Sequence, residues 1–118
     1  MIDVRQYTTS KFLIKIKKQV EKYWPDARLN VRSLRLNSTK IRVYFNQEGF
    51  VEIFYAQKSA KFSFALILKQ ERVFGIDNSR GWHIHPLDNP GKHEPIEEPD
   101  LNLCFKFIHE TIDKLSLH

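Results

Sequence analysis

The chain of 118 residues is 42% hydrophobic and 28% charged, which is the size and composition of one globular domain with a core of its own. It contains no run of about 18 apolar residues and no apolar segment near Met1, so neither a membrane-spanning helix nor a secretory signal is expected. The single cysteine, Cys104, excludes an internal disulfide bond and is typical of a reducing compartment, which indicates a cytoplasmic protein.

Helical spacing of apolar residues predicts one helix near each end of the chain. The first is expected from about residue 8 to Tyr23, because Pro25 prevents its continuation. The second is expected to begin after Asp100, a residue type that caps helix N-termini well. Its apolar positions include Cys104, which is therefore expected in the core.

Five runs between these helices alternate apolar and polar residues, which is typical of half-buried β-strands. Only a few residues separate one run from the next, and short links join neighbouring antiparallel strands. The expected fold is α+β, a five-stranded antiparallel meander with an N-terminal and a C-terminal helix on one face, in a single domain spanning residues 1–118. The predicted strands are 29–36, 41–46, 50–56, 62–69 and 72–77.

The net charge of +5 is distributed unevenly along the chain. Residues 1–76 contain 15 Lys and Arg against 6 Asp and Glu, whereas residues 77–100 contain 2 against 6. A basic body is typical of proteins that bind nucleic acid, although a merely solvated basic surface has the same composition.

Basic and aromatic residues are expected on the face of the sheet that the helices leave uncovered. Such a face is the usual platform for single-stranded nucleic acid, because bases stack on aromatic rings. The same aromatic residues would serve equally well in a second small core or in the interface of a homodimer. The candidate nucleic-acid contacts on this face are Arg42, Tyr44, Phe54 and Lys69.

Residues 77–100 are expected to form a long functional loop, because they are rich in Pro and His and poor in aliphatic residues. They hold four of the five prolines and three of the five histidines, namely His83, His85 and His93. If the backbone is extended at residues 83–85, the imidazoles of His83 and His85 project from the same side.

Two kinds of chemistry suit this pair of imidazoles. As general acid and base they would cleave a phosphodiester bond, one taking the proton of a 2′-hydroxyl group and the other protonating the leaving oxygen. Asp77 would then orient one ring, and Arg80 would hold the phosphate. Alternatively, His83 and His85 would bind zinc or a similar divalent ion, with Asp77 or His93 as a third ligand. A polar loop with incidental histidines is the remaining interpretation.

Three further residues of this segment are candidates for contacts with nucleic acid. Trp82 would stack on a base, although it would serve equally well as an anchor for the loop. Asn78 follows Asp77 at a strand end, where Asp and Asn also favour turns through their own backbone hydrogen bonds. His93 is the third candidate.

The C-terminal half contains three distinctive stretches, which are Val73-Phe74-Gly75-Ile76-Asp77-Asn78, then Gly81-Trp82-His83-Ile84-His85, then Glu94-Pro95-Ile96-Glu97-Glu98-Pro99-Asp100-Leu101. Together they resemble the TumE family of toxins from prokaryotic toxin–antitoxin pairs. The family pattern is a strand that closes on an aromatic-x-Asp-Asn motif, a histidine-rich loop, an acidic stretch with proline, and a C-terminal helix.

The resemblance implies a small cytoplasmic toxin that acts on RNA or translation and is neutralised by a cognate antitoxin protein. The positions that match the family motif are Asp77, Asn78, His83 and His85. This chain departs from the family in having Arg80-Gly81-Trp82 where members often have histidines. The sequence therefore predicts a metal-independent endoribonuclease toxin without a cofactor. The alternatives are a non-catalytic nucleic-acid-binding module and a metal-dependent hydrolase.

Overall fold

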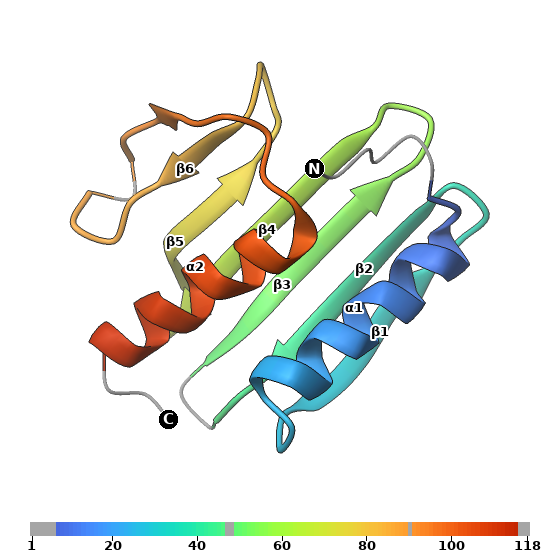
Figure 1. Ribbon diagram of the computed structural model, residues 1–118, viewed down its shortest axis with the longest axis horizontal. Coiled ribbons are helices and arrows are strands. Elements are labelled where there is room, and N and C mark those ends of the chain that lie inside the picture. The colour runs from blue at the N-terminus through green and yellow to red at the C-terminus, as the bar shows by residue number, and fades with distance from the viewer. Residues whose placement is uncertain (1–6, 47–48, 90, 116–118) are drawn as a thin grey trace.

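Two helices and one antiparallel sheet make up the computed structural model, which describes residues 7–46, 49–89 and 91–115 (Figure 1). The general class α+β, predicted from the sequence, is confirmed. In chain order the elements are α1 (Thr9–Tyr23), β1 (Arg28–Leu34), β2 (Ser38–Tyr44), β3 (Gly49–Ala56), β4 (Lys61–Leu68), β5 (Glu71–Asp77), β6 (His83–His85), β7 (Glu94–Pro95) and α2 (Leu101–Lys114).

Each helix begins at a side-chain cap. The Thr8 hydroxyl accepts a hydrogen bond from the backbone N–H of Lys11 at 3.1 Å, and the Asp100 carboxylate accepts one from Leu103 at 2.7 Å. These bonds satisfy N–H groups that have no partner within the first turn of a helix. The expectation that Asp100 caps the second helix is confirmed.

The sheet has seven strands, in the order of the chain, and each strand pairs antiparallel with the next. The prediction of five strands was therefore wrong, because β6 and β7 extend the sheet within the segment expected to be a loop. These two strands contain only three and two residues. A run this short has no detectable period, and only its pairing with β5 makes it a strand.

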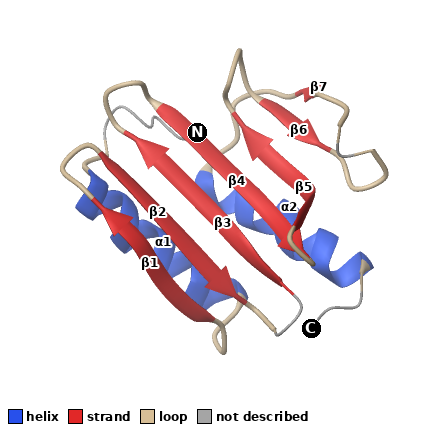
Figure 2. Cartoon of the chain, turned by 180° about the vertical axis from the view of Figure 1, so that it is seen from behind, coloured by secondary structure: helices blue, strands red, loops and turns tan. Residues whose placement is uncertain are grey.

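Both helices cover the same face of the sheet (Figure 2). The core between the two layers is built from alternate residues of β2 to β5 and from the apolar stripes of the helices. Fully buried core residues include Phe12 and Ile16 of α1, Ile53 of β3, Phe64 of β4, and Phe105 and Ile108 of α2.

No helix among the described residues is both long and apolar enough to cross a membrane.

The face of the sheet opposite the helices carries the residues that alternate with this core, and we call it the open face. Strand pairing aligns them in rows that run across the strands. The first row is Lys40, Phe54, Ser63, Asp77 and His83. The second row, beside it, is Arg42, Glu52, Ala65, Gly75 and His85. The open face therefore continues from β2 to the histidines of β6.

Candidate active site

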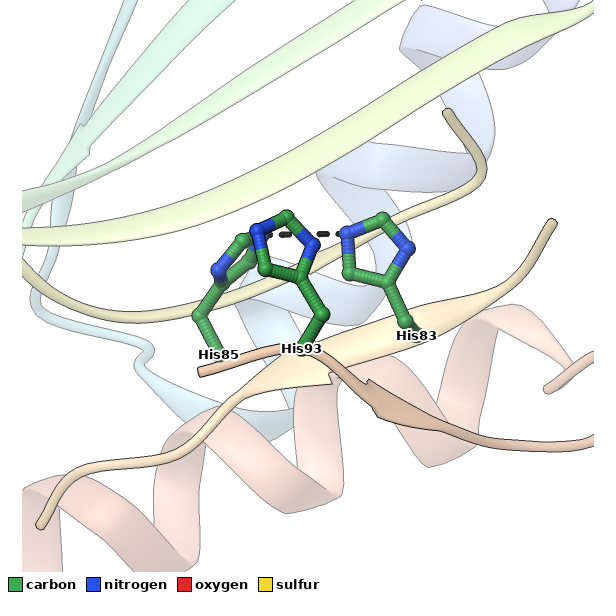
Figure 3. A group of neighbouring side chains, drawn as sticks. All are labelled: His83, His85 and His93. Carbon is green, nitrogen blue, oxygen red and sulfur yellow. Dashed lines mark hydrogen bonds between the residues drawn. The ribbon is translucent and has the colours of Figure 1, made fainter. Parts of the chain in front are cut away.

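Three imidazole rings gather where the open face reaches β6. His83 and His85 are two positions apart on β6, so both project from the open face. His93 directly precedes β7, and the pairing of Ile84 with Glu94 brings it opposite His85. The ring centroids lie 4.8 Å (His83–His85), 4.7 Å (His83–His93) and 4.4 Å (His85–His93) apart. The rings rise from the strand on the side away from α2 (Figure 3).

Asp77 joins two of these rings. It is the cross-strand partner of His83, and its Oδ1 lies 3.1 Å from His83 Nε2. Its Oδ2 lies 3.1 Å from His85 Nε2. The same carboxylate accepts a hydrogen bond from the backbone N–H of Ser79 at 3.0 Å. Asp77 was predicted to orient one ring, and in the structure it contacts both.

The hydrogen-bond partners of His83 indicate which of its ring nitrogens carry a proton. Nδ1 lies 3.0 Å from the carbonyl oxygen of Gly81, which only accepts, so Nδ1 carries a proton. Nε2 faces the carboxylate of Asp77, which also accepts. Nε2 of His83 also lies 3.1 Å from Nε2 of His85, so the two rings share the carboxylate of Asp77.

The hydrogen-bond partners of His85 indicate that its Nδ1 accepts and its Nε2 donates. Nδ1 lies 3.3 Å from Nη2 of Arg72, and a guanidinium group only donates, so Nδ1 accepts. The proton of the neutral ring is therefore on Nε2, within 3.1 Å of both Asp77 Oδ2 and His83 Nε2. His85 thus donates towards Asp77 and fixes the position of the carboxylate.

Arg72 was not among the residues predicted for the site. It lies five positions before Asp77, and on a regular strand the two side chains would point to opposite faces. A bulge at Val73 instead turns Arg72 to the face of the sheet that carries Asp77. Ile67 pairs with Arg72, while the preceding residue, Leu66, pairs with Phe74, so Val73 is the extra residue. No local sequence pattern indicates such a bulge.

Gly75 provides the space in which Arg72 and His85 meet. A Cβ atom at Gly75 would lie 3.4 Å from both Cδ of Arg72 and Cδ2 of His85. A methyl group at this position would therefore lie in contact with both side chains. A glycine inside a strand often marks a close approach of this kind. Gly75 was the only sign in the sequence that side chains pack closely over this part of β5.

His93 differs from the other two histidines in exposure. His83 and His85 are only 7% and 3% exposed, whereas His93 is exposed. Loss of hydration beside the other rings, followed by the positive charge that His85 and His83 carry when protonated, lowers the pKa of His93 below its ordinary value near 6.5. A neutral imidazole of this kind accepts a proton at neutral pH.

The rings border a cavity of about 600 Å³ that is open to solvent. His83 and His85 contribute to its buried wall, and His93 is its exposed imidazole. Arg80, predicted to hold phosphate, is exposed in the turn after β5 with φ +58° and borders the same cavity. The complete lining is Arg72, Asp77, Ser79, Arg80, Gly81, Trp82, His83, His85, His93 and Pro95.

The residues predicted to bind nucleic acid lie in different places. Trp82 both borders the cavity and packs against the core ring of Phe62, with centroids 5.5 Å apart. Arg42, Tyr44 and Phe54 are on the open face, two or more strands from the histidines. Lys69 lies in the turn between β4 and β5 with φ +49°.

Asn78 has both groups of its side-chain amide engaged within the fold. Its Oδ1 accepts a hydrogen bond from the backbone N–H of Phe62 at 2.8 Å, and its Nδ2 donates to the carbonyl of Ala60 at 2.7 Å. These bonds fasten the end of β5 to the start of β4. They account for an asparagine at this position without a contact to nucleic acid.

We expect Asn78→Ala to lower the free energy of unfolding by about 1–3 kcal/mol, because it removes hydrogen-bond partners from two part-buried backbone groups. Asn78→Asp keeps the acceptor for Phe62 but sets a carboxylate oxygen against the carbonyl oxygen of Ala60, so it should also lower the free energy of unfolding. Urea denaturation of the three proteins measures both differences. Equal stability of Asn78→Ala and the unchanged chain would contradict the fastening role.

Ligand atoms of the three histidines lie within 4.8 Å of one another. A histidine that ligates a metal usually donates its other N–H to a carbonyl or carboxylate oxygen. The carbonyl of Gly81 meets this requirement for His83. The guanidinium of Arg72 opposes it for His85, since it supplies a proton to the ring instead of accepting one.

Comparison of the chain with models of protein families, with curated proteins and with solved structures gave no match. The resemblance to TumE toxins therefore rests on the residues quoted from the sequence, and the function has to be argued from the site itself.

Proposed function

We propose that the chain is a metal-independent endoribonuclease that cleaves RNA by histidine acid–base catalysis, and that it is the toxin of a toxin–antitoxin pair. One observation carries the proposal: a single carboxylate, Asp77, lies 3.1 Å from both His83 and His85, beside a third imidazole and in a cavity that two arginines border. Histidine pairs held in this way are suited to moving protons at neutral pH.

Each step of the reaction is assigned to a residue that lines the cavity. His93 accepts the proton of a 2′-hydroxyl group, and the oxygen attacks the adjacent phosphorus. The bond from phosphorus to the 5′-oxygen breaks as His83 donates its Nε2 proton to that leaving oxygen, which takes the place of Asp77 Oδ1 as the partner of Nε2. The products are a 2′,3′-cyclic phosphate and a 5′-hydroxyl end. Arg72 and Arg80 border the cavity and would stabilise the negative charge that develops on the phosphate.

The environment of His85 supports a reaction without a metal ion. Its Nε2 carries the proton of the neutral ring because Arg72 occupies Nδ1. A metal ligand at Nε2 would have to displace that proton beside a guanidinium. His85 is better placed to hold Asp77, which in turn stabilises the imidazolium of His83.

The assignment as a toxin is supported by the resemblance of residues 73–101 to the TumE family, in which Asp77, His83 and His85 are matching positions. A cognate antitoxin is then the expected protein partner, and RNA the expected substrate. The excess of basic residues in the body of the chain is consistent with a polyanionic substrate.

The test is cleavage of a single-stranded RNA by the purified chain, together with growth arrest when the chain is induced in bacteria. The double variant His83→Ala/His85→Ala is expected to lose both effects. His109→Ala is the matched control, since His109 lies on α2 with Nδ1 3.4 Å from Asp113. Cleavage and arrest by the double variant at the unchanged rate would contradict the proposal. RNA binding without cleavage by the unchanged chain would favour the non-catalytic alternative.

A further inference from the structure

We propose that the substrate is single-stranded RNA and that it lies across the open face, along the row formed by Lys40, Phe54, Ser63, Asp77 and His83. The inference rests on the proposed ribonuclease function and names the substrate class and the surface that binds it. The aromatic ring of Phe54, the ammonium group of Lys40 at the far end of the row and the continuity of the row with the histidines identify the occupant.

The register of the sheet makes this row continuous. Lys40 pairs with Phe54, Phe54 with Ser63, Ser63 with Asp77, and Asp77 with His83. Neighbouring strands are about 4.8 Å apart, so Phe54 lies roughly 14 Å from His83. A few extended nucleotides would cover this distance. The row therefore connects a possible base-stacking position with the site of cleavage.

The side chains between Phe54 and Asp77 are small. Ser63 separates the two residues within the row, and Ala65 lies beside Ser63 in the neighbouring row. A nucleotide strand would thus meet little obstruction between the ring of Phe54 and Asp77. Beyond Phe54, the ammonium group of Lys40 supplies a cation for a phosphate.

The neighbouring row is less suited to RNA. The Arg42 guanidinium pairs with the Glu52 carboxylate at 3.2 Å, so the cation of this row is already engaged. The aromatic rings beside it are already covered by cations, which lie 4.4 Å from the ring of Tyr44 and 4.5 Å from the ring of Phe50. These cations are the guanidinium groups of Arg28 and Arg42. Of the sequence-predicted contacts, Phe54 is therefore the one that we assign to stacking.

A duplex would not use this row. Stacking on Phe54 requires a base that has left its own stack, and single strands present such bases. No helix among the described residues lies on the open face, so none there is placed to enter a groove (Figure 2).

The experiment measures binding separately from cleavage. The probe is a fluorescent six-nucleotide RNA with 2′-deoxyribose at every position except the 3′ end, so that no 2′-hydroxyl adjoins a phosphodiester bond and the probe is not cleaved. Phe54→Ala is expected to weaken its binding about 5- to 100-fold, the range measured for loss of one stacked base. Phe54→Leu keeps an apolar side chain without the aromatic face and should weaken binding nearly as much. Tyr44→Ala, an aromatic control on the same face, should change it less than twofold.

A second measurement uses cleavage of a dinucleotide, which is too short to reach Phe54 from the histidines. Phe54→Ala should cleave it at the unchanged rate while cleaving the longer RNA with a raised KM. Binding that is unaffected in both Phe54 variants, or equally weakened by Tyr44→Ala, would overturn the inference and leave the ribonuclease function standing. Phe54-dependent binding without cleavage of any RNA would overturn the proposed function and leave the binding surface standing.

Discussion

Replacing His93 by alanine is expected to lower kcat for RNA cleavage by about 10²- to 10⁴-fold, the usual contribution of a general base. The ring is exposed at the cavity and lies 4.4 Å and 4.7 Å, centroid to centroid, from His85 and His83. KM should change little, because His93 acts on the 2′-hydroxyl proton in the transition state. Steady-state kinetics with a short fluorogenic RNA measures both constants.

The control for this variant is Lys92→Ala. Lys92 is the exposed neighbour of His93, and its ammonium group lies 3.2 Å from the Glu94 carboxylate. Removal of this surface ion pair should leave kcat within about twofold. Equal activity of His93→Ala and Lys92→Ala would show that His93 is not the base.

The pH dependence of the same reaction provides a further test, because the direction in which activity changes can be predicted. His93 accepts a proton only when neutral, so activity falls as the pH drops through its pKa. Loss of hydration, then the positive charges that His85 and His83 carry when protonated, lower this pKa more than the carboxylate of Asp77 raises it, so the acidic limb should lie below the ordinary value near 6.5. The charge of Arg72 acts in the same direction, so Arg72→Gln should move the pKa of His93 upwards in an NMR titration.

The second large effect is expected for Asp77→Asn, which should lower kcat by about 10²- to 10⁴-fold. The carboxylate accepts hydrogen bonds from two imidazoles and from the backbone N–H of Ser79. Asparagine has one acceptor oxygen, so its NH₂ group would face an imidazole N–H. One ring must then turn, and His83 loses the negative charge that stabilises its imidazolium form.

Asp88→Asn is the matched control for this charge change. Asp88 is exposed in the segment after β6 and does not line the cavity that contains the histidines. Its replacement should leave kcat unchanged. Cleavage by Asp77→Asn at the rate of Asp88→Asn would contradict the role of the bridging carboxylate.

The sequence was sufficient for those parts of the fold that have a local signal. Helical spacing and the cap at Asp100 located both helices, and period-two alternation located β1 to β5. β6 and β7 escaped detection because two or three residues have no period, and their Pro and Gly neighbours indicate a loop. Their strand character depends on the free edge of β5, which is a property of the assembled sheet.

The residues of the candidate site also fall into those that the sequence indicated and those that only the assembled sheet brings into place. His83, His85 and Asp77 were identified because their spacing and position at a strand end are visible in the sequence. Arg72 was missed because only the bulge at Val73 turns it towards Asp77. His93 was noted as an RNA contact, but its place opposite His85 follows from pairing between β6 and β7. Contacts across strands therefore account for what the sequence left out.

The most direct test of metal-independent acid–base cleavage is the chemical nature of the new RNA ends. The purified chain is incubated with a single-stranded RNA in excess EDTA, and the fragments are analysed by mass spectrometry. The account predicts undiminished cleavage that leaves a 2′,3′-cyclic phosphate and a 5′-hydroxyl group. Fragments with a 3′-hydroxyl and a 5′-phosphate, or cleavage that stops in EDTA and returns with a divalent ion, would contradict it.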